Sequence, residues 1–204
     1  MPEQLTVEGI VLRRRPVGEK FLHLDLLTAS HGLMGLRKPI SASGKSGANP
    51  DWLDLLQCTV QRNGPGSIWY GKEWLILHRH TALAQSSEAM QCAATFSRFL
   101  LVNLPHFPTD PEPHQLLRDT LQAWEERPHP TVALLKAYYR FARTEGFPVR
   151  EHWLISLPPE SARAAEVLLR TPLDQLPQHN PAVTPILHSL QQWMQSEAEL
   201  RFPN

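Results

Sequence analysis

Hydrophobic residues change their spacing near residue 80, and this change divides the chain into two parts. Before residue 80 they alternate with polar residues, as at positions 22–26, where three leucines flank His23 and Asp25. A period of two is typical of a strand with one buried face. The pattern predicts five short strands, at residues 6–12, 22–26, 33–37, 53–61 and 67–77.

Turn residues separate these segments. Residues 16–19, His31-Gly32 and residues 63–66 supply the Gly, Pro and Asn that tight turns require. The Ser/Gly/Pro-rich stretch at residues 39–50 predicts a longer loop. Five short strands joined by tight turns favour a small closed barrel over an open sheet, because closure removes unpaired edges.

After residue 80, apolar residues recur every three or four positions, which is typical of amphipathic helices. Ser86 or Ser87 is the expected N-cap of the first helix, Thr131 that of the third, and Gly146 the glycine that ends the third. The sequence therefore predicts an α+β chain, with a five-stranded barrel at residues 1–80 and an all-α domain at residues 81–204. The expected helices cover residues 86–103, 116–127, 131–146, 160–170 and 185–200.

The composition fits a chain with a buried core, since 42% of its 204 residues are hydrophobic and 20% are charged. No apolar run approaches the roughly 18 residues of a membrane span, and the acidic start lacks the features of a signal peptide. Cys58 and Cys92 are too few for a disulfide framework or a four-cysteine zinc site. We expect a cytoplasmic protein that holds no metal or cofactor.

The net charge is zero, but the two parts differ in sign. Residues 1–80 carry ten basic and seven acidic side chains, a net +3, and the remainder carries a net −3. A difference of this size is informative only through the places where the charges lie. Arg13-Arg14-Arg15 is the densest basic run in the first part.

The amino-terminal stretch also carries a family resemblance. The string EGIVLRRRPVGEK at residues 8–20, followed by Leu26-Leu27-Thr28 and His31-Gly32-Leu33, resembles the opening of the RecO DNA repair proteins. The string TEGFP at residues 144–148 resembles the end of a helix in that family. The resemblance spans residues 8 to about 150 and is most specific in the first 40.

The resemblance implies an amino-terminal OB-fold, a helical bundle, and a role in DNA recombination and the repair of DNA damage. RecO proteins bind single- and double-stranded DNA, promote strand annealing, and work with RecR and single-stranded DNA-binding protein. This role needs no catalysis, and the sequence shows no catalytic triad or Gly-rich nucleophile motif.

Two features depart from the family. The four-cysteine zinc motif that many members carry is missing after residue 149, and the usually basic loop after the third strand keeps only Lys38 and Lys45. An alternative therefore stays open, namely a protein-interaction module that has lost its affinity for DNA.

Basic residues of the first part are candidates for contacts to DNA phosphates, and the alternative is a solvated barrel end. Alternation along the strand places Arg13 and Arg15 on one face and Arg14 on the other. Trp69 is the candidate for base stacking, whereas Tyr70 and Trp74 share the parity of Ile68 and are expected in the core. The candidate DNA-binding residues are Arg13, Arg15, Lys20, Arg37, Lys38, Lys45, Trp69 and Lys72.

The helical part offers a candidate surface for a protein partner. Lys136, Arg140 and Arg143 fall on one helix face, and Arg98 lies on an earlier helix. The resemblance implies that these four side chains border a groove for the acidic, apolar tail of single-stranded DNA-binding protein. A solubilising helix face explains the same spacing.

Overall fold

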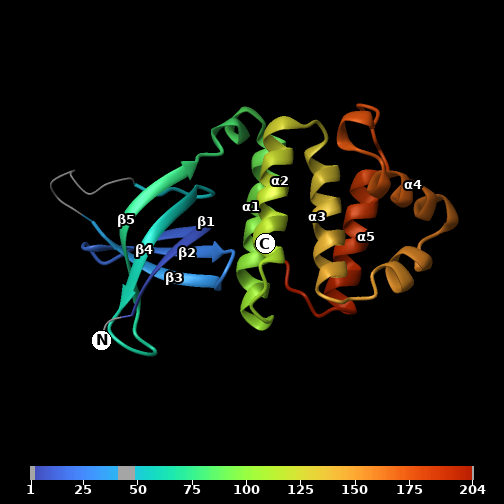
Figure 1. Cartoon of the computed structure of the whole chain (residues 1–204). Helices are drawn as coiled ribbons and strands as arrows, with labels where there is room; N and C mark the ends of the chain where they lie inside the picture. The colour runs from blue at the N-terminus through green and yellow to red at the C-terminus, as the bar shows by residue number, and fades with distance from the viewer. Residues whose placement is uncertain (1–2, 41–48, 204) are drawn as a thin grey trace. The chain divides into compact units, whose positions relative to one another are not determined.

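The computed structural model describes residues 3–40 and 49–203 of the chain. It confirms an α+β organisation in which five strands precede the helices (Figure 1). The expected loop at residues 39–50 falls mostly outside the described residues, as does Lys45. The strands are β1 (Glu3–Val17), β2 (Phe21–Thr28), β3 (Gly32–Pro39), β4 (Leu55–Arg62) and β5 (Trp69–His78).

The five strands pair in the order β1-β2-β3-β5-β4 and close into a barrel. Closure depends on β1, which pairs with β4 through its first half and with β2 through its second half. An extra residue between Val11 and Arg13 interrupts the pairing with β2, and such a bulge bends a strand. Strands β2 and β3, and strands β4 and β5, pair antiparallel. Strands β3 and β5 pair parallel, with Leu36 opposite Trp69 and Arg37 opposite Tyr70.

The barrel interior is filled by aliphatic side chains, including Leu24, Leu26 and Leu36, none of which is measurably exposed. Trp69, Trp74 and Ile76 of β5 pack against this core. Trp74 is thus a core residue as expected, but the expectation for the other two aromatic residues is wrong. Trp69 packs on the core, whereas Tyr70 is 37% exposed.

A break in the β5 register explains this reversal. The pairing with β4 shifts by one residue between Cys58 and Thr59, and Glu73 adopts a left-handed φ of 47°. The extra residue changes the alternation, so positions 69 and 71 share the inner face with positions 74 and 76. Simple alternation from Ile76 back to Tyr70 fails because it assumes an unbroken strand.

Five α-helices and four short helical turns follow the sheet in the described part of the chain. The N-cap prediction for α1 is confirmed, because the Ser86 hydroxyl accepts a hydrogen bond from Ala89 N at 3.2 Å. The helices are α1 (Ser87–Asn103), α2 (Glu112–Glu126), α3 (Pro130–Thr144), α4 (Pro159–Arg170) and α5 (Val183–Ser196); the turns are η1 (Thr81–Gln85), η2 (Leu104–His106), η3 (Arg150–Leu154) and η4 (Leu173–Gln175).

The two ends of α3 differ in how well the sequence predicts them. Gly146 ends the helix as expected, with φ +82°, and N–H groups of Gly146 and Phe147 donate to the last turn. At the start, Thr131 is not the cap, since Pro130 already occupies the first turn. The Thr131 hydroxyl instead donates to the Glu88 carboxylate.

Aromatic side chains form the centre of the helical core. Helix α3 contacts both α1 and α5, and it lies between them in Figure 1. Phe99 of α1 meets Tyr138 and Phe141 of α3 edge to face, each with ring centroids 5.0 Å apart. Phe202, near the carboxyl end, completes the cluster at 4.9 Å from Phe99.

The contacts divide the chain into two compact units. The first contains residues 1–80 and 104–115, and the second contains residues 81–103 and 116–204. The sequence predicts residues 104–115 as part of the helical domain, whereas the contacts assign them to the first unit. No helix among the described residues combines the length and the hydropathy that crossing a membrane requires.

Candidate nucleic-acid interface and a basic pocket

One row of side chains crosses the outer face of the barrel over four strands. Arg15 of β1 pairs with His23 of β2, His23 with Arg37 of β3, and Arg37 with Tyr70 of β5. Residues directly opposite one another on paired strands share a face of the sheet. At about 4.8 Å per strand, the row spans about 14 Å. We call Arg15, His23, Arg37 and Tyr70 the outer row.

The cations in the outer row, and Lys20 beside it, have side-chain donors without a partner among the described residues. Arg15 is exposed, and no side chain among the described residues bonds its guanidinium. Lys20, in the turn between β1 and β2, is likewise exposed and without an ion pair in that part of the chain. The Nε of Arg37 is buried and has no hydrogen-bond partner among the described residues. A buried donor without a partner is costly. Arg37 as a whole is half-buried, so the exposed part of its side chain is what a phosphate can contact.

Arg13 lies on the same face but has an internal counter-ion. Its Nε donates to the Asp25 carboxylate at 2.6 Å, and His23 Nε2 lies 3.1 Å from the other Asp25 oxygen. Arg14 extends to the opposite face, 3.5 Å from Asp51, as alternation predicts. Within residues 3–40 and 49–203, Arg15 is therefore the member of the basic run that has no carboxylate partner, so its charge is available to a ligand.

The structure places two lysines of the predicted DNA-binding set in different environments. Lys38 pairs with Leu22 on the inner face, and it is only 6% exposed. Burial lowers the pKa of its ammonium group, because the charged form loses solvation. Lys72 is exposed and donates to Gln61 at 2.6 Å, on β4 beside the end of the outer row.

The aromatic residues of β5 exchange the roles that the sequence assigns to them. Trp69 is half-buried on the core, and the Arg62 guanidinium covers its ring at 4.4 Å from the centroid. Tyr70 is exposed instead, and it meets Phe21 of β2 edge to face with centroids 5.9 Å apart. The sequence pattern assigns Tyr70 to the core because it does not reveal the register break in β5. Phe21 lies one residue before the strand predicted at residues 22–26 and is not among the predicted site residues.

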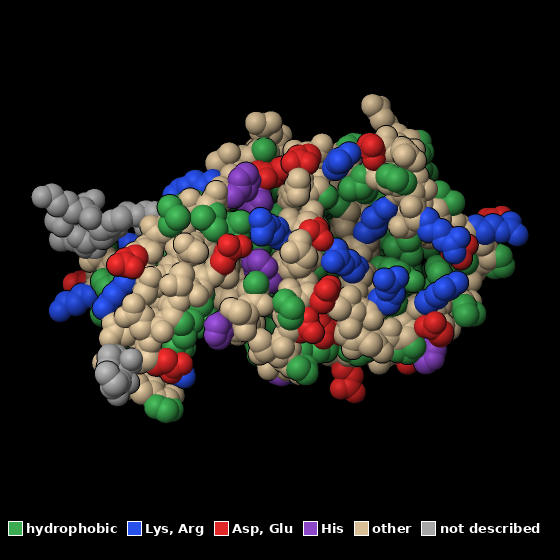
Figure 2. Space-filling model, viewed as in Figure 1, with side chains coloured by type: hydrophobic (Ala, Val, Ile, Leu, Met, Phe, Trp, Pro, Cys, Tyr) green, Lys and Arg blue, Asp and Glu red, His purple; other side chains and the backbone are tan. Residues whose placement is uncertain are grey.

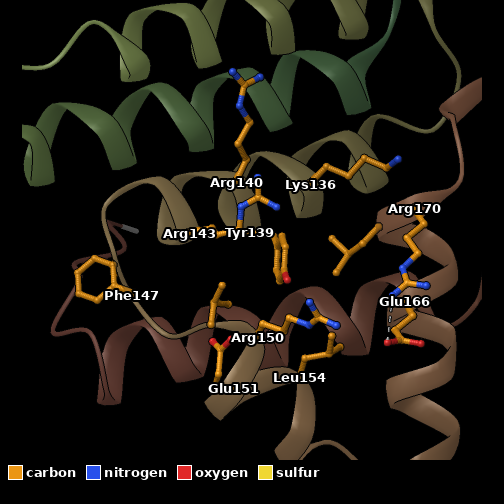
Figure 3. Close-up of a pocket in the computed structure, with 12 residues that line it drawn as sticks. Lys136, Tyr139, Arg140, Arg143, Phe147, Arg150, Glu151, Leu154, Glu166 and Arg170 are labelled. Carbon is orange, nitrogen blue, oxygen red and sulfur yellow. Dashed lines mark ion pairs between the residues drawn. The ribbon is translucent and has the colours of Figure 1, made fainter.

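The helical unit contains a pocket of about 670 Å³, formed by α3, η3 and α4. Figure 3 shows Tyr139 extending from α3 into this space, opposite Arg150 and Leu154 of η3. We call it the basic pocket. Its apolar lining is Tyr139, Phe147, Val149, Leu154 and Leu169, and its cations are Lys136, Arg140, Arg143, Arg150 and Arg170.

Three of these cations are engaged within the protein. Lys136 donates to the Thr171 carbonyl, and burial lowers the pKa of its ammonium group. Arg140 points away from the pocket in Figure 3 and donates to Asp119 at 2.7 Å, and Arg170 lies 3.7 Å from Glu166. Arg143 and Arg150 are exposed, and neither guanidinium has an ion pair within the described ranges.

The structure brings together three of the four predicted partner-binding residues. Lys136, Arg140 and Arg143 line the basic pocket, but Arg98 of α1 does not. Figure 2 shows Lys and Arg side chains gathered around hydrophobic atoms over α3 and α4. The sequence does not predict Arg150 and Arg170 as part of this surface, because they lie on elements that follow α3 and share no helix face with it.

No protein-family model matches the chain, and no curated protein matches it either.

Proposed function

We propose that the protein is a non-enzymatic DNA-binding recombination mediator of the RecO type, and that its barrel is an OB-fold. The strand order β1-β2-β3-β5-β4, with a bent β1 shared by both neighbours, supports this fold. OB-folds bind oligonucleotides on the face of their second and third strands. The outer row crosses that face through His23 and Arg37.

The outer row is the observation that carries the proposal. It sets Arg15 and the incompletely bonded Arg37 beside an exposed Tyr70 on adjoining strands. Guanidinium groups bind phosphates, and an aromatic face binds a base of any sequence. A zero net charge does not oppose this reading, because binding depends on the local field rather than on the sum over the chain.

In this role the protein binds single- and double-stranded DNA through phosphate contacts and promotes annealing of complementary strands. RecR and single-stranded DNA-binding protein are the partners that the RecO resemblance suggests. The chemistry of the outer row requires no cofactor, because it binds DNA without changing a covalent bond.

Fluorescence anisotropy with a labelled oligonucleotide at low salt tests the proposal. We expect binding by the intact chain, and a loss of about tenfold or more when Arg15 and Arg37 are both changed to Ala. Arg163→Ala is the matched control, since Arg163 is an exposed arginine of the helical unit. Absence of binding at tens of micromolar protein, or equal effects of the control and the double variant, would reject the proposal.

A second candidate function rests on the basic pocket. Its free Arg143 and Arg150 beside an apolar lining suit an acidic peptide with an apolar end, as expected of a protein-interaction module. The measurement is calorimetric titration with a synthetic acidic peptide that ends in an apolar residue. This function predicts that the intact chain binds the peptide and that the variant with both Arg143→Ala and Arg150→Ala does not. Peptide binding by a chain that binds no DNA would favour this function over the first.

A further inference from the structure

An aromatic pair stands on the outer face of the barrel with no structural role in its core. The core side of β5 is already occupied by Trp69 and Trp74, with Gly71 between them. Tyr70 therefore contributes nothing to the interior, and 37% of its surface is exposed. Its contact is with Phe21 across the sheet, at 5.9 Å and an interplanar angle of 65°.

This edge-to-face contact fixes the tyrosine ring. A T-shaped pair restrains an aromatic side chain that would otherwise rotate about two torsions. Phe21 itself is held opposite Val17 and Pro39, at the paired ends of β1, β2 and β3. A restrained, exposed ring loses little conformational freedom when a flat ligand stacks on it.

Hydrogen-bond donors border the pair on two sides. Arg37 is the strand partner of Tyr70 on β3; it is half-buried and its guanidinium makes no ion pair within the described ranges. On β4 the strand partner is Gln61, which accepts from Lys72. The ligand that matches this arrangement has a flat apolar group flanked by anionic groups on both sides.

We propose that Tyr70, positioned by Phe21, stacks an unpaired base, and that the outer face consequently binds single strands more tightly than duplexes. This inference rests on the proposed DNA-binding function and adds strand selectivity to it. In a duplex each base is already stacked and paired, so its face is not accessible to Tyr70, and only the phosphate contacts of Arg15 and Arg37 remain. A single strand makes both kinds of contact.

The test compares three probes of equal phosphate number at one salt concentration: an oligothymidine, an abasic strand that lacks bases, and a duplex. With the intact chain we expect the oligothymidine to bind about tenfold more tightly than the abasic strand. Equal affinity for these two probes would overturn the inference, and this comparison needs no variant.

Tyr70→Ala should lose about tenfold in affinity for the oligothymidine and little for the abasic strand or the duplex. Tyr70→Phe should keep the wild-type affinity, because it retains the ring. Leu75→Ala is the control, since Leu75 is an exposed apolar residue of the same strand. An equal loss for all three probes in Tyr70→Ala would contradict stacking.

Failure of the inference differs from failure of the proposed function. If the intact chain binds none of the three probes at low salt, the DNA-binding proposal itself falls. If it binds all three with the same affinity, DNA binding stands and the stacking role of Tyr70 is rejected.

Discussion

The indole of Trp74 lies against the backbone of Gly71, so closely that a Cβ atom on residue 71 would be 2.0 Å from Cζ2 of the ring. Both residues belong to β5, and Glu73, with its left-handed φ of 47°, stands between them. The contact keeps Trp74 on the core side of the sheet. The register shift at Glu73 that brings Trp74 and Gly71 to the same side of the strand is the one that leaves Tyr70 outside.

Gly71→Ala should destabilise the protein by about 1–3 kcal/mol, because the added methyl group forces the indole out of its position. Urea denaturation measures the loss. In a Trp74→Ala background the same change should cost much less, since the ring that blocks the methyl group is gone. An equal cost in both backgrounds would show that the contact does not limit residue 71.

Lys38→Met should alter how stability depends on pH. Burial lowers the pKa of Lys38 below its usual 10.5, so the unfolded chain holds this proton more tightly than the folded chain. The unfolding free energy of the wild type should therefore rise, relative to the variant, as pH increases through the interval just below 10.5. Denaturation curves at pH 7 and pH 10 check this, and a difference independent of pH would contradict it.

Asn103→Ala should release the carboxyl-terminal segment. The Asn103 amide donates to the Arg201 carbonyl and accepts from Arg201 N, both at 2.9 Å, and the side chain is only 2% exposed. Losing these bonds in a buried position should cost about 1–3 kcal/mol. Thermal unfolding measures this, and limited trypsin digestion should cut after Arg201 faster in the variant. Digestion at the wild-type rate would contradict the tethering role.

Gly146→Ala isolates the strain of a helix end. No atom lies within 4 Å of an added Cβ, but φ is +82°, so the cost comes from the backbone conformation alone. We expect a loss of about 1 kcal/mol, and a smaller loss for Gly146→Asn, because Asn tolerates the left-handed region better. Chemical denaturation of the two variants gives the order, and Asn at least as costly as Ala would contradict it.

The sequence predicts the elements well because their signals are local. Alternating leucines mark β2, Ser86 caps α1, and Gly146 ends α3, each through the chemistry of a few neighbouring residues. The Arg13 and Arg14 side chains also diverge as alternation requires. Such features depend on the period of the backbone, which the residue pattern reports directly.

The sequence predicts the candidate site less completely, because the site depends on strand register and on pairing between residues that are distant in the sequence. The register shift near Glu73 turns Trp69 toward the core and Tyr70 toward the outside, and no residue type in β5 indicates this shift. The charge of Arg13 is paired with the carboxylate of Asp25, twelve positions away in the sequence. Lys38 turns inward because Leu22 is its partner. Charge alone, read along the chain, indicates none of these outcomes.

We propose that Arg15, Lys20 and Arg37 present cationic groups to a polyanion at the outer face of the barrel. The most direct measurement is the affinity for an oligothymidine as a function of salt concentration, in the wild type and in the Arg15→Ala, Arg37→Ala double variant. Because each phosphate contact on a single strand contributes about −0.7 to the log–log slope, the wild type should give a slope near −2, and the double variant should be shallower by about 1.4. A wild-type slope near zero, or one that the two substitutions leave unchanged, would contradict phosphate binding by these residues.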